Sequence, residues 1–241
     1  MTDKKTGMRK GLTQYGDAEF SLYLRKAFIK GMGYTDDALD RPIVGITNTF
    51  SGYNACHGTV PQLIESIKRG VMLAGGLPVE FPTITIHESF AFPTSMYMRN
   101  LMSMDTEEMV RAQPMDSVVL IGGCDKTVPA LLMGAASAGV PAILEVTGPM
   151  LPGSHKGERL GACTDCRRFW GKYRAGEIDA DEIAQIRPIG PISWNLRRYG
   201  HSQYHGYRWR SIGHDASRRR MHSSGSGGSF PPRRTNRSPS R

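Results

Sequence analysis

Short apolar, β-branched runs alternate along the chain with segments whose apolar side chains recur every three to four positions. The first pattern predicts buried strands and the second predicts amphipathic helices. The predicted strands are residues 42–47, 79–86, 117–121 and 141–146. The predicted helices are residues 20–32, 59–74, 94–104, 106–112 (with Asp105 as N-cap), 127–138 and 175–186. This alternation predicts an α/β fold, a layered parallel sheet with flanking helices.

The composition changes abruptly near residue 186. Residues 187–241 contain 12 Arg, no Lys and one acid, Asp215, which leaves 19 basic and 21 acidic residues in the rest of the chain. We therefore expect an α/β domain over residues 1–186 and a disordered basic tail over 187–241. Residues 1–186 carry no excess positive charge that would attract nucleic acid. The tail interleaves Arg with aromatic residues, so nucleic-acid binding through the tail stays an alternative.

The remaining composition excludes several classes of protein. The sequence has no run of 18 apolar residues, which argues against a membrane span, and its charged N-terminus lacks the apolar stretch of a secretory signal. Four cysteines in a chain of 241 residues do not suggest a disulfide framework. We expect a reducing cytoplasm, in which cysteines tend to be buried, catalytic or metal-bound.

Candidate chemistry lies in the loops that follow the predicted strands. Gly122-Gly-Cys-Asp-Lys126 joins a strand to a helix and offers Cys124 as a soft metal ligand and Asp125 as an oxygen ligand for Mg²⁺. The alternative is that Asp125 only caps the helix. Cys56 lies in the loop after the first strand, beside His57, which we interpret as a capping or packing residue. Glu88 follows the second strand and could join Asp125 at the same edge of the sheet.

Cys163 and Cys166 form a CxxC pair. Such pairs bind zinc or carry out redox chemistry in some proteins, and a structural pair is a further interpretation. Zinc would need the fold to bring all four cysteines together, because the sequence has no second CxxC. Gly122 and Gly123 do not belong to a dinucleotide or P-loop fingerprint.

Several motifs in order resemble the iron–sulfur dehydratases that act on dihydroxy acids and sugar acids. These motifs are Asn54-Ala-Cys-His57, Phe92-Pro-Thr-Ser95, Gly122-Gly-Cys-Asp-Lys-Thr127, Val146-Thr-Gly-Pro-Met150 and Gly161-Ala-Cys-Thr-Asp-Cys-Arg-Arg168. The resemblance covers roughly residues 8–186 and corresponds to the N-terminal half of that family. The stretch from Ala162 to Trp170 looks more like the aldonic-acid branch, such as arabinonate or xylonate dehydratases, than the branched-chain amino-acid enzyme, which stays the alternative.

The resemblance implies a role for each matching residue. Cys56 and Cys124 would be two of three cysteine ligands of a [2Fe–2S] cluster, or of a [4Fe–4S] cluster as in some members. Glu88, Asp125 and carbamylated Lys126 would hold Mg²⁺. The implied reaction is a hydro-lyase reaction that removes water from a 2,3-dihydroxy carboxylic acid and yields a 2-keto-3-deoxy acid. The implied partners are this small-molecule substrate and, in the intact family, further copies in a homo-oligomer.

Two parts of the family pattern are missing from this sequence. The third cluster cysteine belongs to a Gly-Thr-Cys-x-x-Met-Gly-Thr-Ala-Ser-like segment, where this chain has Trp194-Asn-Leu-Arg-Arg-Tyr-Gly-His-Ser-Gln-Tyr-His205. The family's C-terminal domain, which carries a serine base, has no counterpart here. We therefore expect a truncated chain that is inactive alone and name no catalytic base.

The tail predicts a shifted reading frame. With suitable synonymous codons, residues 194–206 read one base later give Gly-Thr-Cys-Gly-Val-Met-Gly-Thr-Ala-Ser-Thr-Met, and residues 211–220 give Ala-Leu-Gly-Met-Met-Leu-Pro-Gly-Gly. Both products are family-like. Sequencing the gene should show that the alternate frame after about codon 187 encodes the rest of the enzyme. Early stop codons in that frame would rule the hypothesis out.

Overall fold

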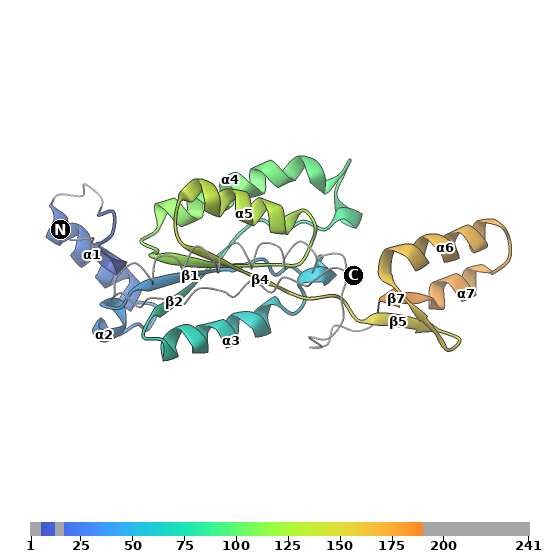
Figure 1. Cartoon of the computed structure of the whole chain (residues 1–241), viewed down its shortest axis with the longest axis horizontal. Helices are drawn as coiled ribbons and strands as arrows, with labels where there is room; N and C mark the ends of the chain where they lie inside the picture. The colour runs from blue at the N-terminus through green and yellow to red at the C-terminus, as the bar shows by residue number, and fades with distance from the viewer. Residues whose placement is uncertain (1–5, 13–16, 190–241) are drawn as a thin grey trace, which may run out of the picture.

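The computed structural model describes residues 6–12 and 17–189. Its main sheet has four parallel strands in the order β2-β1-β3-β4. Helix α3 covers one face, and α4 and α5 cover the other (Figure 1). The strands are β1 (Ile43–Asn48), β2 (Leu77–Pro82), β3 (Ser117–Gly122) and β4 (Ala142–Val146). The helices are α3 (Val60–Leu73), α4 (Arg99–Ala112) and α5 (Thr127–Ala138). The predicted α/β fold with a parallel sheet and flanking helices is confirmed.

Strand β3 supplies the centre of the core on both faces of the sheet. Leu120 packs with Val128 and Leu131 of α5, whereas its neighbour Ile121 packs with Val60 and Ile64 of α3. Successive side chains of a strand point to opposite faces, so two adjacent apolar residues serve two separate helix layers. This explains why β3 reads as a continuous apolar run, as is typical of a strand buried on both faces.

The chain leaves the neighbouring strands β1 and β3 towards opposite faces of the sheet. The chain leaves β1 towards α3 on one face, and leaves the adjacent β3 towards α5 on the other (Figure 1). Loops that diverge from neighbouring parallel strands leave a crevice at the carboxyl edge, which is where open α/β sheets bind ligands. The loops that carry Cys56 and Cys124 are these two loops.

The segment between β2 and β3 differs from the prediction. Residues 94–112 form a 3₁₀ turn, η4 (Ser95–Met98), that runs into the single helix α4, so Asp105 lies inside a helix and is not an N-cap. Its carboxylate accepts a hydrogen bond from the backbone N–H of Ile84 at 2.9 Å. The N–H of Ile84 is therefore not available to the sheet, and β2 ends at Pro82 and not at Ile86.

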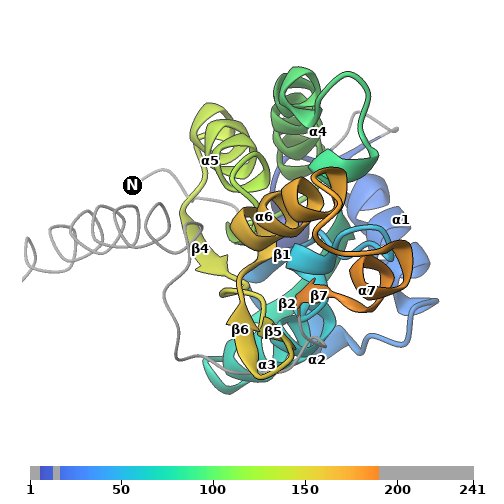
Figure 2. The same cartoon turned by 90° about the vertical axis from the view of Figure 1, so that its right-hand side faces the viewer.

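A second, smaller unit follows β4 and stands beyond the end of the main sheet (Figures 1 and 2). Its antiparallel sheet has the order β6-β5-β7, and helices α6 and α7 accompany it. The sequence predicted α7 but neither α6 nor the strands. The elements are β5 (Pro152–His155), β6 (Glu158–Leu160), α6 (Ala162–Arg174), α7 (Ala180–Gln185) and β7 (Arg187–Ile189).

The first and last elements of the described chain lie on either side of the main sheet in the sequence, and the last one begins just after the predicted domain boundary. Helices α1 (Ala18–Lys30) and α2 (Asp36–Leu39) precede the main sheet. At the other end β7 pairs with β5, so the small sheet uses residues 187–189. The division at residue 186 stays a prediction, and the disordered tail falls on residues 190–241, outside the described residues. None of the helices in the described part of the chain is long and apolar enough to cross a membrane.

Close packing of α4 against α5 depends on Gly134, where an added Cβ would lie 2.6 Å from the Ser103 carbonyl oxygen and 2.8 Å from the Thr106 Cβ. We expect Gly134→Ala to lower the free energy of unfolding by about 1–3 kcal/mol through overpacking. Gly70→Ala, in α3, meets no atom within 4 Å and should raise it by about 0.5–1 kcal/mol, the usual helix-propensity gain. Urea unfolding of both variants measures the contrast, and equal effects would contradict this account.

Candidate active site

Cys56 and Cys124 meet where the loops that follow β1 and β3 come together. Cys56 lies in a 3₁₀ turn, η2 (Ala55–His57), and Cys124 is the second residue after β3. Both thiols are free and half-buried. Their mutual hydrogen bond lowers the pKa of Cys56, and the same bond, together with burial, raises the pKa of Cys124. Cys56 is therefore the thiol of the pair that loses its proton more readily, and the thiolate is the form that binds a thiophilic metal.

Asn54 and Thr147 fix the backbone around the two sulfurs. The buried Oδ1 of Asn54 accepts from the backbone N–H of Cys56 at 3.2 Å and from the Cys124 thiol at 3.5 Å. The Thr147 hydroxyl, just after β4, donates to the Cys56 carbonyl at 2.8 Å. Three strand ends thus position one pair of thiols.

His57 links the two cysteine-bearing loops by hydrogen bonds to the backbone of each. Its Nε2 lies 3.0 Å from the backbone nitrogen of Gly123 and 3.4 Å from that of Cys124, and Nδ1 lies 2.8 Å from the Thr49 carbonyl oxygen. Two N–H donors at Nε2 assign the ring proton to Nδ1, which donates to Thr49. Burial lowers the pKa of His57 to about 4, so the ring is neutral near pH 7. His57 is buried, as the interpretation of a packing residue requires, and it also links the two loops by hydrogen bonds.

Gly123 allows the loops to approach one another. A Cβ at this position would lie 1.9 Å from the Thr147 hydroxyl oxygen and 2.9 Å from the Cys56 carbonyl oxygen. Any side chain would therefore break the contact between Thr147 and Cys56. Glycine is required here for close backbone approach and not for a special backbone angle.

Glu88, Asp125 and Lys126 form a second cluster at the same edge of the sheet. Glu88 begins a 3₁₀ turn, η3 (Glu88–Phe90), beyond β2. Its carboxylate accepts from the Ser95 hydroxyl, from the Thr94 hydroxyl at 2.8 Å and from the Ser95 backbone N–H at 3.0 Å. These bonds, with the nearby Lys126 charge, lower the pKa of Glu88 to about 2, so it is ionised at neutral pH.

Lys126 lies between the two carboxylates. Its Nζ is 3.2 Å from Asp125 Oδ2 and 3.6 Å from Glu88 Oε2. Burial acts to lower the pKa of Lys126, but the hydrogen bond to Asp125 and the two negative charges outweigh it and raise that pKa. The N-cap of α5 is Lys126, without a side-chain capping bond, so Asp125 is not the cap that the alternative interpretation required.

The two clusters suit different ions. Thiolates prefer soft metals and carboxylate oxygens prefer hard ones such as Mg²⁺. No three His, Cys, Asp or Glu side chains gather at one point within residues 6–12 and 17–189. The zinc site built from all four cysteines is therefore wrong, because Cys163 and Cys166 are exposed on α6 in the smaller unit.

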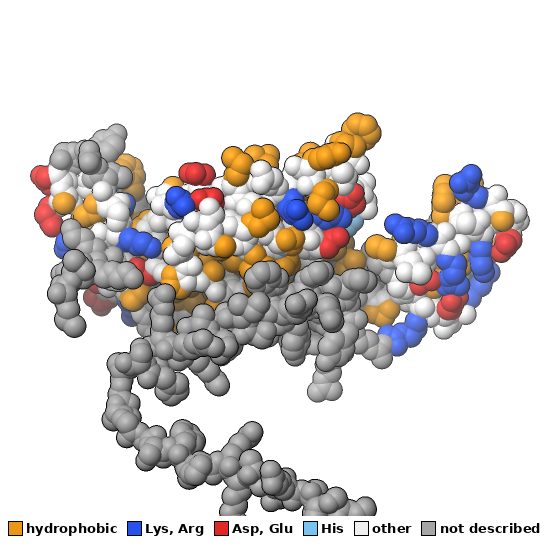
Figure 3. Space-filling view, turned by 45° about the horizontal axis from the view of Figure 1, so that its top comes forward, with side chains coloured by type: hydrophobic (Ala, Val, Ile, Leu, Met, Phe, Trp, Pro, Cys, Tyr) orange, Lys and Arg blue, Asp and Glu red, His pale blue; other side chains and the backbone are white. Residues whose placement is uncertain are grey.

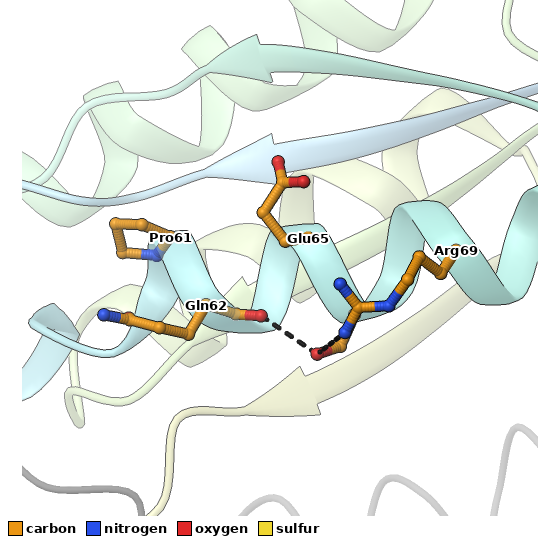
Figure 4. Close-up of a pocket in the computed structure, with 5 residues that line it drawn as sticks. Pro61, Gln62, Glu65 and Arg69 are labelled. Carbon is orange, nitrogen blue, oxygen red and sulfur yellow. Dashed lines mark hydrogen bonds between the residues drawn. The ribbon is translucent and has the colours of Figure 1, made fainter.

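An open groove of roughly 500 Å³ runs along α3, away from these loops (Figure 4). Its side chains bond along their own helix: Ser66 donates to the Gln62 carbonyl at 3.0 Å, and Arg69 donates to the Ser66 hydroxyl at 3.1 Å. The groove is lined by Pro61, Gln62, Glu65, Ser66 and Arg69. It contains neither cysteine nor histidine, so the chemistry lies at the strand ends and not here.

The structure brings together every site residue that the sequence predicted, in two adjoining sets. The sequence assigned no role to Asn54, Thr94, Ser95 or Thr147, which hold those residues in place. Each of the four lies within a motif already noted, so the signal was their position beside a ligand candidate. Their partners, by contrast, depend on loops that meet only in the folded chain.

Comparison with known proteins supports the resemblance. The model of the dihydroxy-acid/6-phosphogluconate dehydratase N-terminal family matches residues 41–189. A dehydratase of Rhizobium meliloti (strain 1021) is 45% identical over 184 residues, 76% of this chain and 32% of that protein. The L-arabonate dehydratase of Azospirillum brasilense is 46% identical over 166 residues, 68% of this chain and 28% of the relative.

Dihydroxy-acid dehydratases are more distant. That of Pyrococcus abyssi (strain GE5 / Orsay) is 37% identical over 163 residues, 66% of this chain and 29% of the relative. The chain thus spans about a third of the length of the relatives it matches. Because the family model covers more than half of this chain, the chain belongs to the dihydroxy-acid/6-phosphogluconate dehydratase family and matches its N-terminal region over residues 41–189.

Proposed function

We propose that this chain provides the metal-binding N-terminal domain of a sugar-acid hydro-lyase. The observation that carries the proposal is the meeting of a thiol pair and a Glu–Asp–Lys cluster at one edge of the sheet. A dehydratase of this class needs a Lewis acid for the departing hydroxyl and a cation for the charge that develops on the substrate. The two clusters offer ligands for each.

Cys56 and Cys124 would hold an iron–sulfur cluster, [2Fe–2S] or [4Fe–4S], and Glu88, Asp125 and Lys126 would hold Mg²⁺. When bound, the cluster and Mg²⁺ supply these two electrophilic functions. Glu88 is already an anion whose oxygens are oriented by Ser95 and Thr94. Lys126 is held as an ammonium by both carboxylates, so carbamylation requires that it first lose a proton. We infer that metal entry and loss of this proton occur together.

The relatives guide the choice of substrate. Two proteins named for sugar acids, the L-arabonate dehydratase above and the 6-deoxy-6-sulfo-D-gluconate dehydratase of Pseudomonas putida, are 46% and 42% identical to this chain, against 37% for the dihydroxy-acid dehydratase of P. abyssi. We therefore propose an aldonic acid such as arabinonate or xylonate. A dihydroxy acid of branched-chain amino-acid synthesis stays the second candidate.

Two further predictions accompany this function. We propose the cytoplasm as the compartment, because thiol-ligated clusters need reducing conditions. We also propose a homo-oligomer, supported by exposed apolar side chains on the side that carries α4 and α5 (Figure 3). Those on α4 and η4 are Met96, Tyr97, Leu101 and Met104. Burial of several exposed apolar side chains on one side of a molecule is a common outcome in oligomers.

The cysteine pair can be tested by metal loading. Anaerobic incubation of the full chain with Fe²⁺ and sulfide should give bound iron and sulfide with visible absorption. Cys56→Ser and Cys124→Ser should each lower the bound iron by at least an order of magnitude, as expected when one of few ligands is lost. Cys163→Ser and Cys166→Ser are the matched controls and should load like the parent chain. Equal loss in all four variants would remove the support for a cluster at the strand ends.

Substrate class can be tested with two chimeras. Residues 1–189 would be joined to the remainder of the A. brasilense enzyme or of the P. abyssi enzyme. We expect the chimera with the A. brasilense remainder to dehydrate L-arabinonate. We expect the chimera with the P. abyssi remainder not to turn over dihydroxy-isovalerate. Lys126→Met in the first chimera should lower kcat by about 10²–10³, the usual cost of losing a preorganised electrostatic contact. Turnover by only the second chimera would favour the branched-chain alternative.

A further inference from the structure

Two thiols lie on the outer surface of α6, apart from the candidate active site. Cys163, Cys166, Arg167 and Trp170 follow the spacing i, i+3, i+4 and i+7, which places them on one side of a helix. All four are exposed, whereas Phe169 is buried. This face therefore presents a dithiol directly to solvent, unlike the half-buried pair at the strand ends.

The inner side of α6 is held firmly, which fixes where the thiols point. Phe169 contacts the ring of His155 edge to face, with 5.7 Å between ring centroids. Asp165, between the two cysteines in sequence, accepts from the Gly161 backbone N–H at 2.5 Å and from Arg168 Nε at 2.9 Å. The Phe169–His155 contact and the ion pair between Arg168 and Glu158 of β6 hold α6 on the small sheet, and Cys163 and Cys166 are left exposed.

Helix geometry brings the two cysteines within disulfide range. Residues three apart in an α-helix have Cα atoms about 5 Å apart, from the rise and radius of the helix. Disulfides span Cα distances of about 4.4–6.8 Å. The sulfurs still require a small tightening of the first turn, and Cys163 is the second residue of α6, where backbone N–H groups have no intrahelical partner to lose.

We propose that Cys163 and Cys166 are a redox modification site, which forms a reversible intramolecular disulfide by exchange with a small-molecule disulfide of the glutathione class. The proposal is independent of the proposed dehydratase function. It concerns a different pair of cysteines on a different element. It also gives the CxxC pair a role that the candidate active site leaves unassigned.

The exchange balances in two steps. The Cys163 thiolate attacks one sulfur of oxidised glutathione, which forms a mixed disulfide and releases one glutathione thiolate. Cys166 then loses its proton to solvent and attacks the Cys163 sulfur, which releases the second glutathione. The cysteine pair loses two electrons, and the glutathione disulfide gains them.

The surroundings support this order of attack. Desolvation, with the adjacent Cys163 and Asp165, raises the pKa of Cys166, and its place one turn after Cys163 on α6 positions it to attack the mixed disulfide. Arg167 is exposed next to Cys166 and offers a cation to the anionic carboxylates of glutathione.

A tryptic peptide isolates the pair. Cleavage after Arg159 and Arg167 yields residues 160–167, which contain both cysteines and no other. The full chain would be reduced, equilibrated anaerobically in glutathione buffers of increasing oxidation, quenched in acid, alkylated and digested. We expect this peptide to lose two hydrogens and to escape alkylation as the buffer becomes oxidising, and reduction should reverse the change.

Variants decide between mechanisms. Cys163→Ser and Cys166→Ser should each carry a glutathione adduct on the remaining cysteine, because the second step cannot occur. The double variant Cys56→Ser/Cys124→Ser should titrate in this peptide like the parent chain. Three results in the parent chain would each overturn the proposal. The peptide could stay a dithiol in every buffer, or it could carry only glutathione adducts. It could also be cross-linked to the peptides that contain Cys56 or Cys124.

Discussion

The candidate active site depends on one buried imidazole. His57 accepts from the backbone of the β3 loop through Nε2 and donates to the backbone of the β1 loop through Nδ1, so a neutral ring ties together the segments that carry Cys56 and Cys124. A protonated ring could not accept from Gly123, and burial opposes that proton. The relative position of the two thiols therefore depends on the ionisation state of a fully buried residue.

Much of this arrangement could be predicted from the sequence because its signals are local. The apolar run of β3 and the small residues of α5 define those elements without tertiary information, and the loops after β1 and β3 follow from them. The wrong prediction of Asp105 as an N-cap had a physical cause. A carboxylate before a helical pattern is normally a cap, but here it accepts a hydrogen bond from the backbone N–H of Ile84. Helix α6 was missed because its sequence mixes charged residues, aromatic residues and cysteines without a clear apolar period.

The hydrogen bonds that position the candidate ligands could not be predicted in the same way. Asn54, Ser95 and Thr147 are ordinary turn and strand-end residues, and their function exists only through partners on other loops. The Lys126 ammonium between Asp125 and Glu88 likewise depends on β2 and β3 ending at the same edge, although they are separated in the sheet by β1. Sequence motifs identified the candidate ligands, and the sheet topology determines how they lie relative to one another.

The contact between His57 and Gly123 joins residues that are 66 positions apart. Closing a chain segment of that length has a large entropic cost, and the thiol pair does not exist until β1 and β3 are aligned. Any metal centre that binds both thiols would therefore bind the folded chain far better than the unfolded one and would stabilise it in proportion to its affinity. Assembly of such a centre would then be a late folding event, because the bound group would link the loops that follow β1 and β3 only after these strands are aligned.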